Sequence, residues 1–326
     1  MTNSIETFPP KDSREFLIKS GIAGGIAGCV AKTVIAPLDR VKILYQTNHA
    51  AYRGYAFSRH GLTKSIKRIY HVSGVRGLYQ GHTATLYRIF PYAGIKFVAY
   101  EQVRRLLIHS EDYETNGRRF LSGSLAGMCS VFFTYPLELI RVRLAYITGS
   151  SNKPRLLNVT SQVLHERDFG NLKETPLRTS IRRISNFYRG FSVTLMGIFP
   201  YAGMSFLAHD LATDFFHNPV IKRALRSEKD ERHLSTWSEL TAGALAGVCG
   251  QTISYPFEVC RRKMQVGGVE SRSRFLKLQN VIKSTYRDAG LRGFFVGLTI
   301  GYLKVIPMVS TSFFVYTRSK SYLGID

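Results

Sequence analysis

The chain has 326 residues, of which 45 are Lys or Arg and 22 are Asp or Glu, so its formal net charge is +23. This excess of cations favours a polyanionic partner, whether nucleic acid, anionic lipid or a multiply charged metabolite. The four cysteines form neither a paired framework nor a CxxC motif, which argues against a disulfide scaffold and a zinc ribbon; they are Cys29, Cys129, Cys249 and Cys260.

The first 15 residues form an N-terminal tail with no apolar run, and they contain too many acids for a transit peptide. Beyond the tail, several charge-poor stretches are long enough to span a bilayer. Small residues fill these stretches and charges interrupt them, which predicts a multi-helix membrane protein with a water-filled interior. A soluble helical bundle is the alternative. The stretches are 21–38, 121–137, 241–257 and 298–315.

One pattern occurs three times, as APLDRVKILYQ (36–46), YPLELIRVRLA (135–145) and YPFEVCRRKMQ (255–265). Each copy contains Pro-x-Asp/Glu-x-x-Lys/Arg. Upstream of each copy, two glycines stand four residues apart, a spacing that lets membrane helices approach closely. The glycine pairs are Gly24 and Gly28, Gly123 and Gly127, and Gly243 and Gly247.

A second pattern follows each copy of the first, as RIFPYAGIKF (88–97), GIFPYAGMSF (197–206) and the eroded KVIPMVSTSF (304–313). The chain therefore consists of three repeats, each with two proline-containing helices. We predict an all-α membrane protein with six transmembrane helices in three pseudo-symmetric two-helix repeats. The repeats cover residues 16–108, 117–215 and 236–322 and form one integral transport domain.

The segments that follow the first helix of each repeat are basic, and residues 47–80 contain no acid. Within them, 61–71 and 276–287 have helical spacing with basic faces. These two segments predict short helices on the membrane surface, suited to anionic lipid.

Charges beside the prolines are expected to pair, because charges inside a membrane are costly unless they face a cavity and have partners. Lys32, Asp39 and Gln46 are seven residues apart and share one helix face. Under three-fold symmetry, each acid reaches the base of the next repeat. Such a ring is either purely structural or a gate of breakable pairs. The predicted pairs are Asp39 with Arg141, Glu138 with Arg261, and Glu258 with Lys42.

The triple motif resembles that of the mitochondrial carrier family (solute carrier family 25), and the resemblance covers about residues 16–322. It implies that the three pairs form a matrix gate and that the short surface helices lie on the matrix side. In the family a glutamine after the motif braces a pair. Gln46 and Gln265 match that position, whereas Ala145 replaces the second brace.

The resemblance also implies a cytoplasmic gate on the even-numbered helices, built from an aromatic-acid-x-x-base motif. The motif is complete in the first repeat and decays in the other two, so only Asp210 with Lys320 remains as an ionic pair. We therefore expect this gate to be weak. The three copies are Tyr100, Glu101 and Arg104; His209, Asp210 and Thr213; and Tyr316, Thr317 and Lys320.

Equivalent positions in the second pattern hold three different residues: Arg88, Gly197 and Lys304. An asymmetric solute cannot be recognised by three identical residues, and these positions match the substrate contact points of the family. The resemblance implies that Arg88 and Lys304 bind phosphates and that Gly197 with Ile198 accepts a flat base. Helix packing is the alternative role for Gly197, and an interfacial position is the alternative for the two cations.

Two further cations are expected at the same site. Lys32 has Val131 and Gln251 as its counterparts and matches a nucleotide-contacting lysine of the family. Lys96 stands eight residues beyond Arg88 and is expected to line the same cavity. Four cations favour a substrate with several phosphates.

Within the family, the ADP/ATP exchangers carry an arginine triplet followed by methionines on the fifth helix, where this chain has RRKMQ (261–265). Carriers of ATP-Mg and phosphate usually add a calcium-binding N-terminal region. The resemblance is therefore closest to the coenzyme A carrier branch, which includes the fungal coenzyme A carriers and the Graves disease carrier protein. An adenine nucleotide carrier is the alternative.

The resemblance implies a monomeric, multi-pass transporter of the mitochondrial inner membrane that works by alternating access. It implies no cofactor, no metal and no catalytic residue, with cardiolipin as bound lipid. A nucleic-acid-binding protein would explain the charge but not the three repeated patterns. An enzyme would need a catalytic dyad outside the symmetric positions, and the sequence contains none that we recognise.

Overall fold

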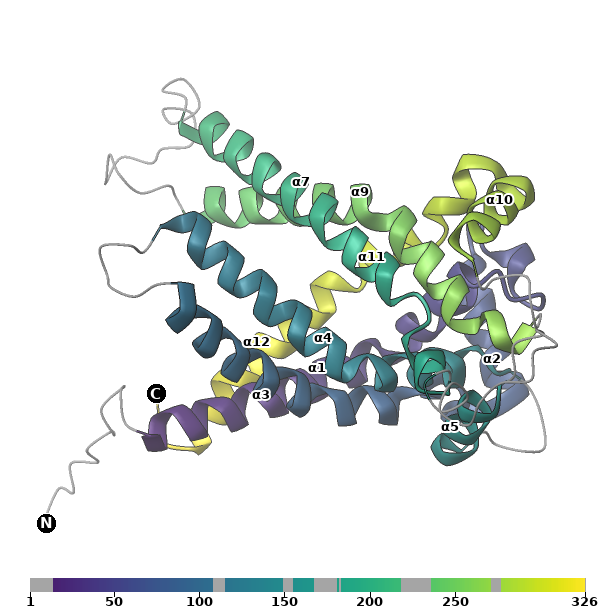
Figure 1. Cartoon of the computed structure of the whole chain (residues 1–326), viewed down its shortest axis with the longest axis horizontal. Helices are drawn as coiled ribbons and strands as arrows, with labels where there is room; N and C mark the ends of the chain where they lie inside the picture. Colours follow the sequence, from purple (N-terminus) through teal and green to yellow (C-terminus); the bar gives the residue numbers. More distant parts are fainter. Residues whose placement is uncertain are drawn as a thin grey trace, which may run out of the picture. The chain divides into compact units, whose positions relative to one another are not determined.

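The computed structural model describes residues 14–107, 115–148, 155–166, 181, 183–217, 236–270 and 277–325. These residues form helices joined by turns, and no strand occurs among them (Figure 1). The elements are α1 (Arg14–Gln46), η1 (Arg53–Tyr55), α2 (Gly61–Leu78), α3 (His82–Leu107), α4 (Asn116–Tyr146), α5 (Leu156–His165), η3 (Asn186–Tyr188), α7 (Phe191–His217), α9 (Thr236–Glu270), α10 (Leu278–Ala289), η4 (Gly290–Phe295), α11 (Leu298–Leu303) and α12 (Val305–Tyr322).

The predicted all-α architecture is confirmed, including two long helices in each repeat and short helices at 61–71 and 276–287. In the described part of the chain, four stretches are long and apolar enough to cross a membrane: Ile18–Gln46, Gly117–Tyr146, Arg183–Phe216 and Leu278–Tyr322. The expected stretch at 241–257 is not among them, because Gln251 and several small polar residues lower its apolarity.

Five of the long helices continue through an internal proline: Pro37, Pro91, Pro136, Pro200 and Pro256. The sixth is interrupted at Lys304, which separates α11 from α12. The interruption is slight, because Lys304 keeps helical dihedral angles and its N–H donates to the Ile300 carbonyl oxygen at 3.2 Å, while Met308 N–H donates to the Lys304 carbonyl oxygen at 3.2 Å.

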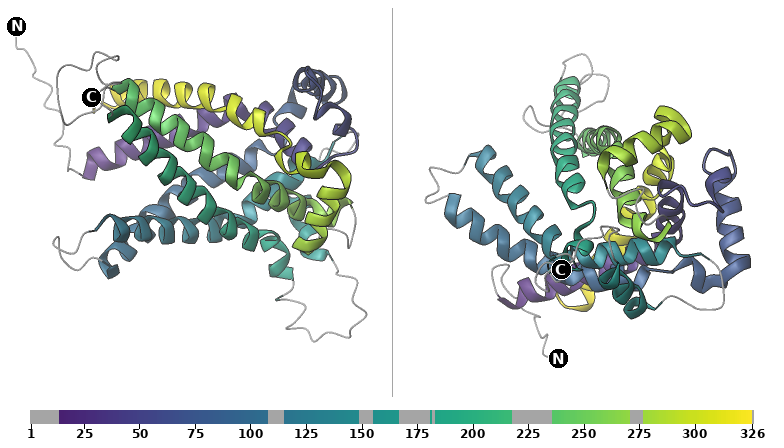
Figure 2. Two further views of the ribbon diagram at one scale, coloured as in Figure 1. Left: turned by 90° about the horizontal axis from the view of Figure 1, so that it is seen from above. Right: turned by 45° about the vertical axis from the view of Figure 1, so that its right-hand side comes forward.

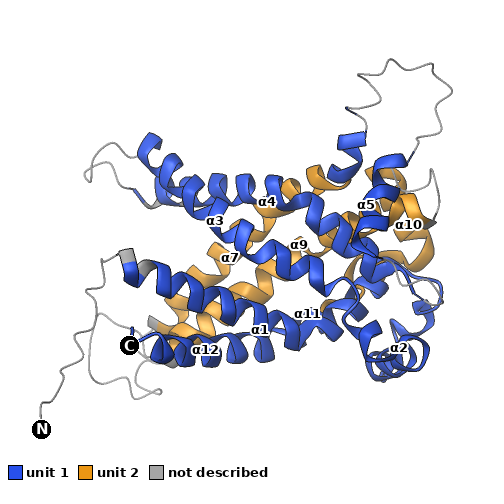
Figure 3. Ribbon diagram, turned by 90° about the horizontal axis from the view of Figure 1, so that it is seen from below, with its two compact units in different colours: residues 1–188, 299–326 blue, residues 189–298 orange. Residues whose placement is uncertain are grey.

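The long helices pack in pairs: α3 against α4, α1 against α12, and α7 against α9 (Figure 2). Contacts divide the chain into two compact units (Figure 3). Unit 1 comprises residues 1–188 and 299–326 and contains the α3–α4 and α1–α12 pairs. Unit 2 comprises residues 189–298 and contains the α7–α9 pair.

Within each unit, the glycines in the repeated four-residue spacing show no unusually close helix contact, and a Cβ on Gly28 would lie 3.8 Å from Ile89, an ordinary van der Waals distance. A Cβ added to Gly24 or Gly123 would meet no atom within 4 Å. The close approaches occur at other glycines. A Cβ on Gly25 would lie 2.5 Å from the Phe90 ring, and one on Gly250 would lie 2.2 Å from the Ser205 hydroxyl. On α1 the closely packed glycine is thus one residue beyond Gly24, about 100° around the helix.

Candidate functional site

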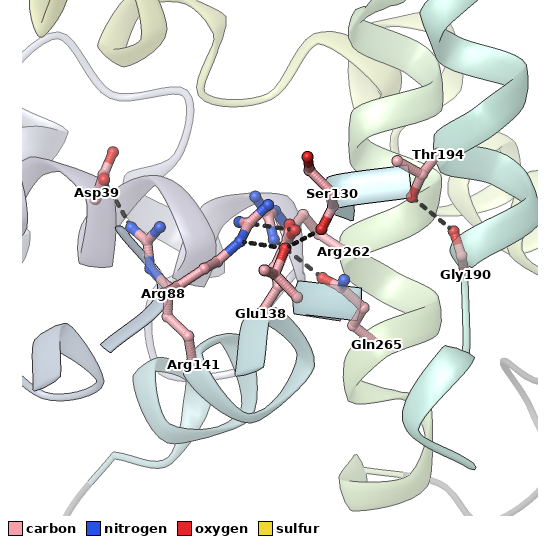
Figure 4. Close-up of polar contacts among 10 residues, drawn as sticks. Asp39, Arg88, Ser130, Glu138, Arg141, Gly190, Thr194, Arg262 and Gln265 are labelled. Carbon is pink, nitrogen blue, oxygen red and sulfur yellow. Dashed lines mark hydrogen bonds and ion pairs between the residues drawn. The ribbon is translucent and has the colours of Figure 1, made fainter. Parts of the chain in front are cut away.

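Asp39 binds two cations at once. It lies two residues after Pro37 on α1, and it is 7% exposed. Its Oδ2 accepts from Arg141 Nη2 of α4 at 2.7 Å, and its Oδ1 accepts from Lys304 Nζ at 2.8 Å. Figure 4 shows the Arg141 side chain extending toward Asp39. The predicted pairing of Asp39 with Arg141 is present, and Lys304 is an additional partner.

Arg88 forms the matching contact on the α3–α4 pair. Its Nη1 lies 2.9 Å from Glu138 Oε2, and Glu138 is 2% exposed (Figure 4). Both cations expected to contact substrate are therefore bound to carboxylates expected to form the matrix gate. The sequence contained a signal for this arrangement, since positions 88 and 304 are equivalent in the repeats and so are positions 138 and 39.

Six charged residues of unit 1 form what we call the charge cluster. Lys32 joins it because its ammonium lies within electrostatic range of Asp39, Arg88, Arg141 and Lys304. Lys32 Nζ also donates to the Met308 sulfur at 3.5 Å. The cluster holds four cations and two carboxylates, an excess of two positive charges: Lys32, Arg88, Arg141 and Lys304 against Asp39 and Glu138.

The other two predicted gate pairs, Glu138 with Arg261 and Glu258 with Lys42, each join residues of different units and stay predictions. The two bracing glutamines, Gln46 and Gln265, are both buried. Gln265 Oε1 accepts from Arg262 Nη1 at 3.0 Å, and Arg262 was not expected at the gate (Figure 4).

Gly197 and Ile198 lie on α7 in unit 2, where both are partly buried. A Cβ at position 197 would lie 3.1 Å from the Cβ of Phe257 on α9. The absent side chain therefore permits close packing of α7 on α9, which is the alternative role that the sequence left open. Lys96 is exposed on α3.

The residues expected at the cytoplasmic gate are more exposed than those of the matrix gate. The Glu101 side chain is 47% exposed and binds Arg105 at 3.1 Å, one turn along α3, rather than Arg104. Asp210 is exposed in unit 2, and Lys320 belongs to unit 1 with Tyr316. Tyr100 and Tyr316 are partly buried.

Sequence reasoning missed two contacts on α4. Thr134 accepts a hydrogen bond from Arg88 Nε at 3.3 Å. Arg143 is fully buried and forms a two-pronged ion pair with Glu166, the residue after α5. The contact between Arg88 and Thr134 could have been predicted, because Thr134 and Glu138 are four residues apart and share one face of α4. Glu166 stands in a segment whose helix was not expected.

Buried, paired charges on or beside helices of membrane-spanning length are typical of multi-pass membrane proteins that move a polar solute. The three repeats then identify the family. The model of the family described as "Mitochondrial carrier protein" matches the chain three times, at residues 13–111, 113–220 and 232–326. The chain therefore belongs to this family.

Similar proteins agree with this assignment. An uncharacterised mitochondrial carrier of Schizosaccharomyces pombe is 70% identical, with all of both chains covered. A mitochondrial carrier protein of Saccharomyces cerevisiae is 46% identical over 97% of this chain and 93% of its own. The mitochondrial carrier protein CoAc2 of Zea mays is 36% identical over 94% of this chain and 87% of its own.

Proposed function

We propose that this protein transports coenzyme A, or a related adenine nucleotide with several phosphates, across the mitochondrial inner membrane. The observation that supports this proposal most directly is that two cations are each bound to a buried carboxylate: Arg88 to Glu138, and Lys304 to Asp39. A polyphosphate substrate offers the same two cations a stronger set of oxygens. The charge cluster also has an excess of two positive charges for such an anion.

The mechanism follows from competition for these cations. A phosphate that binds Lys304 removes it from Asp39, which then keeps Arg141 alone. A second phosphate that binds Arg88 likewise releases Glu138. Substrate binding therefore changes the partners of both gate carboxylates, and it shifts the gate equilibrium by the difference between its affinities for the two states. Alternating access then needs no covalent step.

The other residues that the sequence predicts at the site have proposed roles in the same cycle. Gly197 with Ile198 is the proposed contact for the adenine, with Ile198 as the apolar surface for the base, while Phe257 occupies the space beside Gly197. Lys32 and Lys96 add positive charge along the path. The cytoplasmic gate closes behind the substrate through Tyr100, Glu101, Arg104, Asp210, Tyr316 and Lys320.

The choice of coenzyme A rests on two kinds of support. The RRKMQ stretch differs from the ADP/ATP exchangers, and a relative in Zea mays carries the name CoAc2. Coenzyme A is a 3′-phosphorylated ADP with a pantetheine arm, so its separated phosphates suit two separate cations. An ADP/ATP or ATP-Mg/phosphate carrier is the second candidate, because it would use the same cations. We propose a monomer with cardiolipin as bound lipid.

The test is uptake by liposomes that contain the purified protein, with labelled coenzyme A, 3′,5′-ADP, ADP and ATP in parallel. We expect saturable coenzyme A uptake that Arg88→Ala or Lys304→Ala abolishes. Uptake of ADP and ATP alone would assign the protein to the second candidate. Uptake of coenzyme A that survives both substitutions would contradict the proposed contact residues.

A further inference from the structure

The guanidinium of Arg88 is held on three sides. Its Nε donates to Thr134 Oγ1 at 3.3 Å, and its Nη1 binds Glu138 at 2.9 Å. Its central carbon lies 5.4 Å from the centre of the Tyr92 ring, one turn along α3. The guanidinium is therefore held by two contacts to α4 and by a cation–π contact over the Tyr92 ring.

The hydroxyl oxygen of Thr134 can only act as the acceptor in its hydrogen bond with Arg88. Its hydroxyl proton is donated to the Ser130 carbonyl oxygen at 2.7 Å. A hydroxyl has one proton, so the oxygen meets Arg88 Nε as an acceptor. Thr134 is only 1% exposed, which leaves little room for water to supply a replacement.

Of the two ion-paired positions of unit 1, the hydroxyl accompanies only the arginine; the third repeat has Ser254 at this position, where the residue equivalent to Arg88 is Gly197. Thr134 and Glu138 are four residues apart and present their side chains on one face of α4. The counterpart of Thr134 beside Asp39 is Ile35, and the cation there is Lys304, which has no N–H corresponding to Nε. Within unit 1, Thr134 therefore accompanies the guanidinium of Arg88, and Ile35 accompanies the ammonium of Lys304.

We propose that Thr134 is a positioning residue for substrate recognition, which orients Arg88 without touching the substrate. This inference rests on the proposed role of Arg88 as a phosphate contact. A guanidinium that is already oriented loses less side-chain freedom when it binds an anion. Thr134 thereby raises the affinity of the site for the anionic group that Arg88 recognises.

The test compares Thr134→Val with Thr134→Ser in the liposome assay, with labelled coenzyme A as the probe, and with labelled ADP if the wild type carries only that. Valine keeps the volume but removes the acceptor. We expect Thr134→Val to raise KM roughly fivefold, the factor for one hydrogen bond of ordinary net strength, with maximal rate per folded protein little changed. Thr134→Ser should restore the wild-type KM. A purely structural role would lower the amount of active protein and leave KM unchanged, which would overturn the proposal.

A double-mutant cycle isolates the contact itself. In an Arg88→Lys background, the ammonium cannot use the Thr134 acceptor in the same way, so Thr134→Val should change KM no further. An equal rise of KM in both backgrounds would overturn the proposal. If Arg88→Lys and Arg88→Ala both leave KM unchanged, the contact role of Arg88 fails and the inference about Thr134 fails with it. If only Thr134→Val is without effect, the proposed function stands and the inference alone is wrong.

Discussion

The carboxylate of Asp39 connects the two parts of the proposed mechanism, because one oxygen binds a gate base and the other binds a substrate cation. A buried ion pair that loses one member leaves an uncompensated charge, which costs about 3–5 kcal/mol. In the proposed mechanism the substrate phosphate takes the place of Asp39 beside Lys304, and Asp39 keeps Arg141 as its partner. Binding is coupled to gating in this mechanism because Asp39 Oδ1 contacts Lys304 and Oδ2 contacts Arg141.

Lys304→Gln should raise KM for the transported nucleotide by about tenfold or more, since a charge-assisted contact to phosphate is lost. The assay is initial uptake rate against substrate concentration in liposomes. Lys283→Gln is the matched control, because Lys283 is exposed on α10. A KM for Lys304→Gln equal to that of the control would contradict the assignment.

Gly197→Ala should make the protein about 1 kcal/mol less stable than Gly203→Ala, since the new methyl would press against Phe257. Both glycines lie on α7, and a Cβ on Gly203 would meet nothing within 4 Å. Thermal unfolding in detergent measures the difference. Equal melting temperatures for the two variants would show that α7 and α9 separate at this point without cost.

At the scale of elements, α4 and α5 are joined by the buried Arg143–Glu166 pair and by an apolar cluster. Glu166→Ala leaves the guanidinium of Arg143 buried without this acid, so we expect a loss of about 3–5 kcal/mol in stability. Glu15→Gln is the control, because the Glu15–Lys19 pair is exposed and such pairs contribute about 0–1 kcal/mol. Similar melting temperatures for both variants would exclude a stabilising role of the buried pair.

The ends of α1 and α4 are joined by Arg40 and His49. Arg40 donates to the carbonyl oxygens of Ala145 and Ile147, at 3.3 and 3.0 Å. The backbone N–H of Ala51 donates to His49 Nδ1, so Nε2 carries the proton and donates to Thr148 Oγ1 at 2.8 Å. This contact requires a neutral imidazole.

Burial lowers the pKa of His49, and the nearby cations Arg40 and Arg68 lower it further. Unfolding restores the ordinary pKa of about 6.5, so the unfolded chain binds the proton more readily. Neutral His49 therefore contributes its full stabilisation above about pH 6.5, the pKa of the unfolded state. This contribution is lost as the pH falls from there through the lowered pKa of His49 in the folded protein. As the pH is lowered from about 7.5 to about 5.5, roughly one unit on either side of the unfolded-state pKa, the melting temperature should fall less for His49→Gln than for the wild type. Parallel curves for variant and wild type would contradict this contribution.

At the scale of the whole molecule, binding through net charge and insertion into the bilayer predict opposite results when membranes that contain the protein are washed with salt. A protein bound by its +23 charge alone should be released by high salt, since salt screens exposed charges. Helices of membrane-spanning length keep the protein in the bilayer. We expect it to stay in the membrane pellet in about 1 M salt, where the screening length is about 3 Å, and to require detergent. Release by salt alone would return the charge-driven alternatives to consideration.

Much of the architecture follows from sequence, because a repeated motif imposes its own symmetry. The three copies of Pro-x-Asp/Glu-x-x-Lys/Arg and of the FPYAG pattern predict paired helices, the Asp39–Arg141 contact and the equivalence of Arg88 with Lys304. Periodicity on one helix also places Lys32 and Asp39 on one face. These are local and symmetry-related properties, which a linear sequence encodes directly.

Only the tertiary structure decided which side chains meet across helix pairs. The structure shows that Lys304 contacts Asp39, that Arg88 contacts Glu138 and Thr134, and that the close glycine contact on α1 is at Gly25. It also formed α5 and buried Arg143 against Glu166. The reason is physical: a motif fixes the face of a helix, whereas a contact depends on the rotation and separation of two helices within a fraction of an ångström.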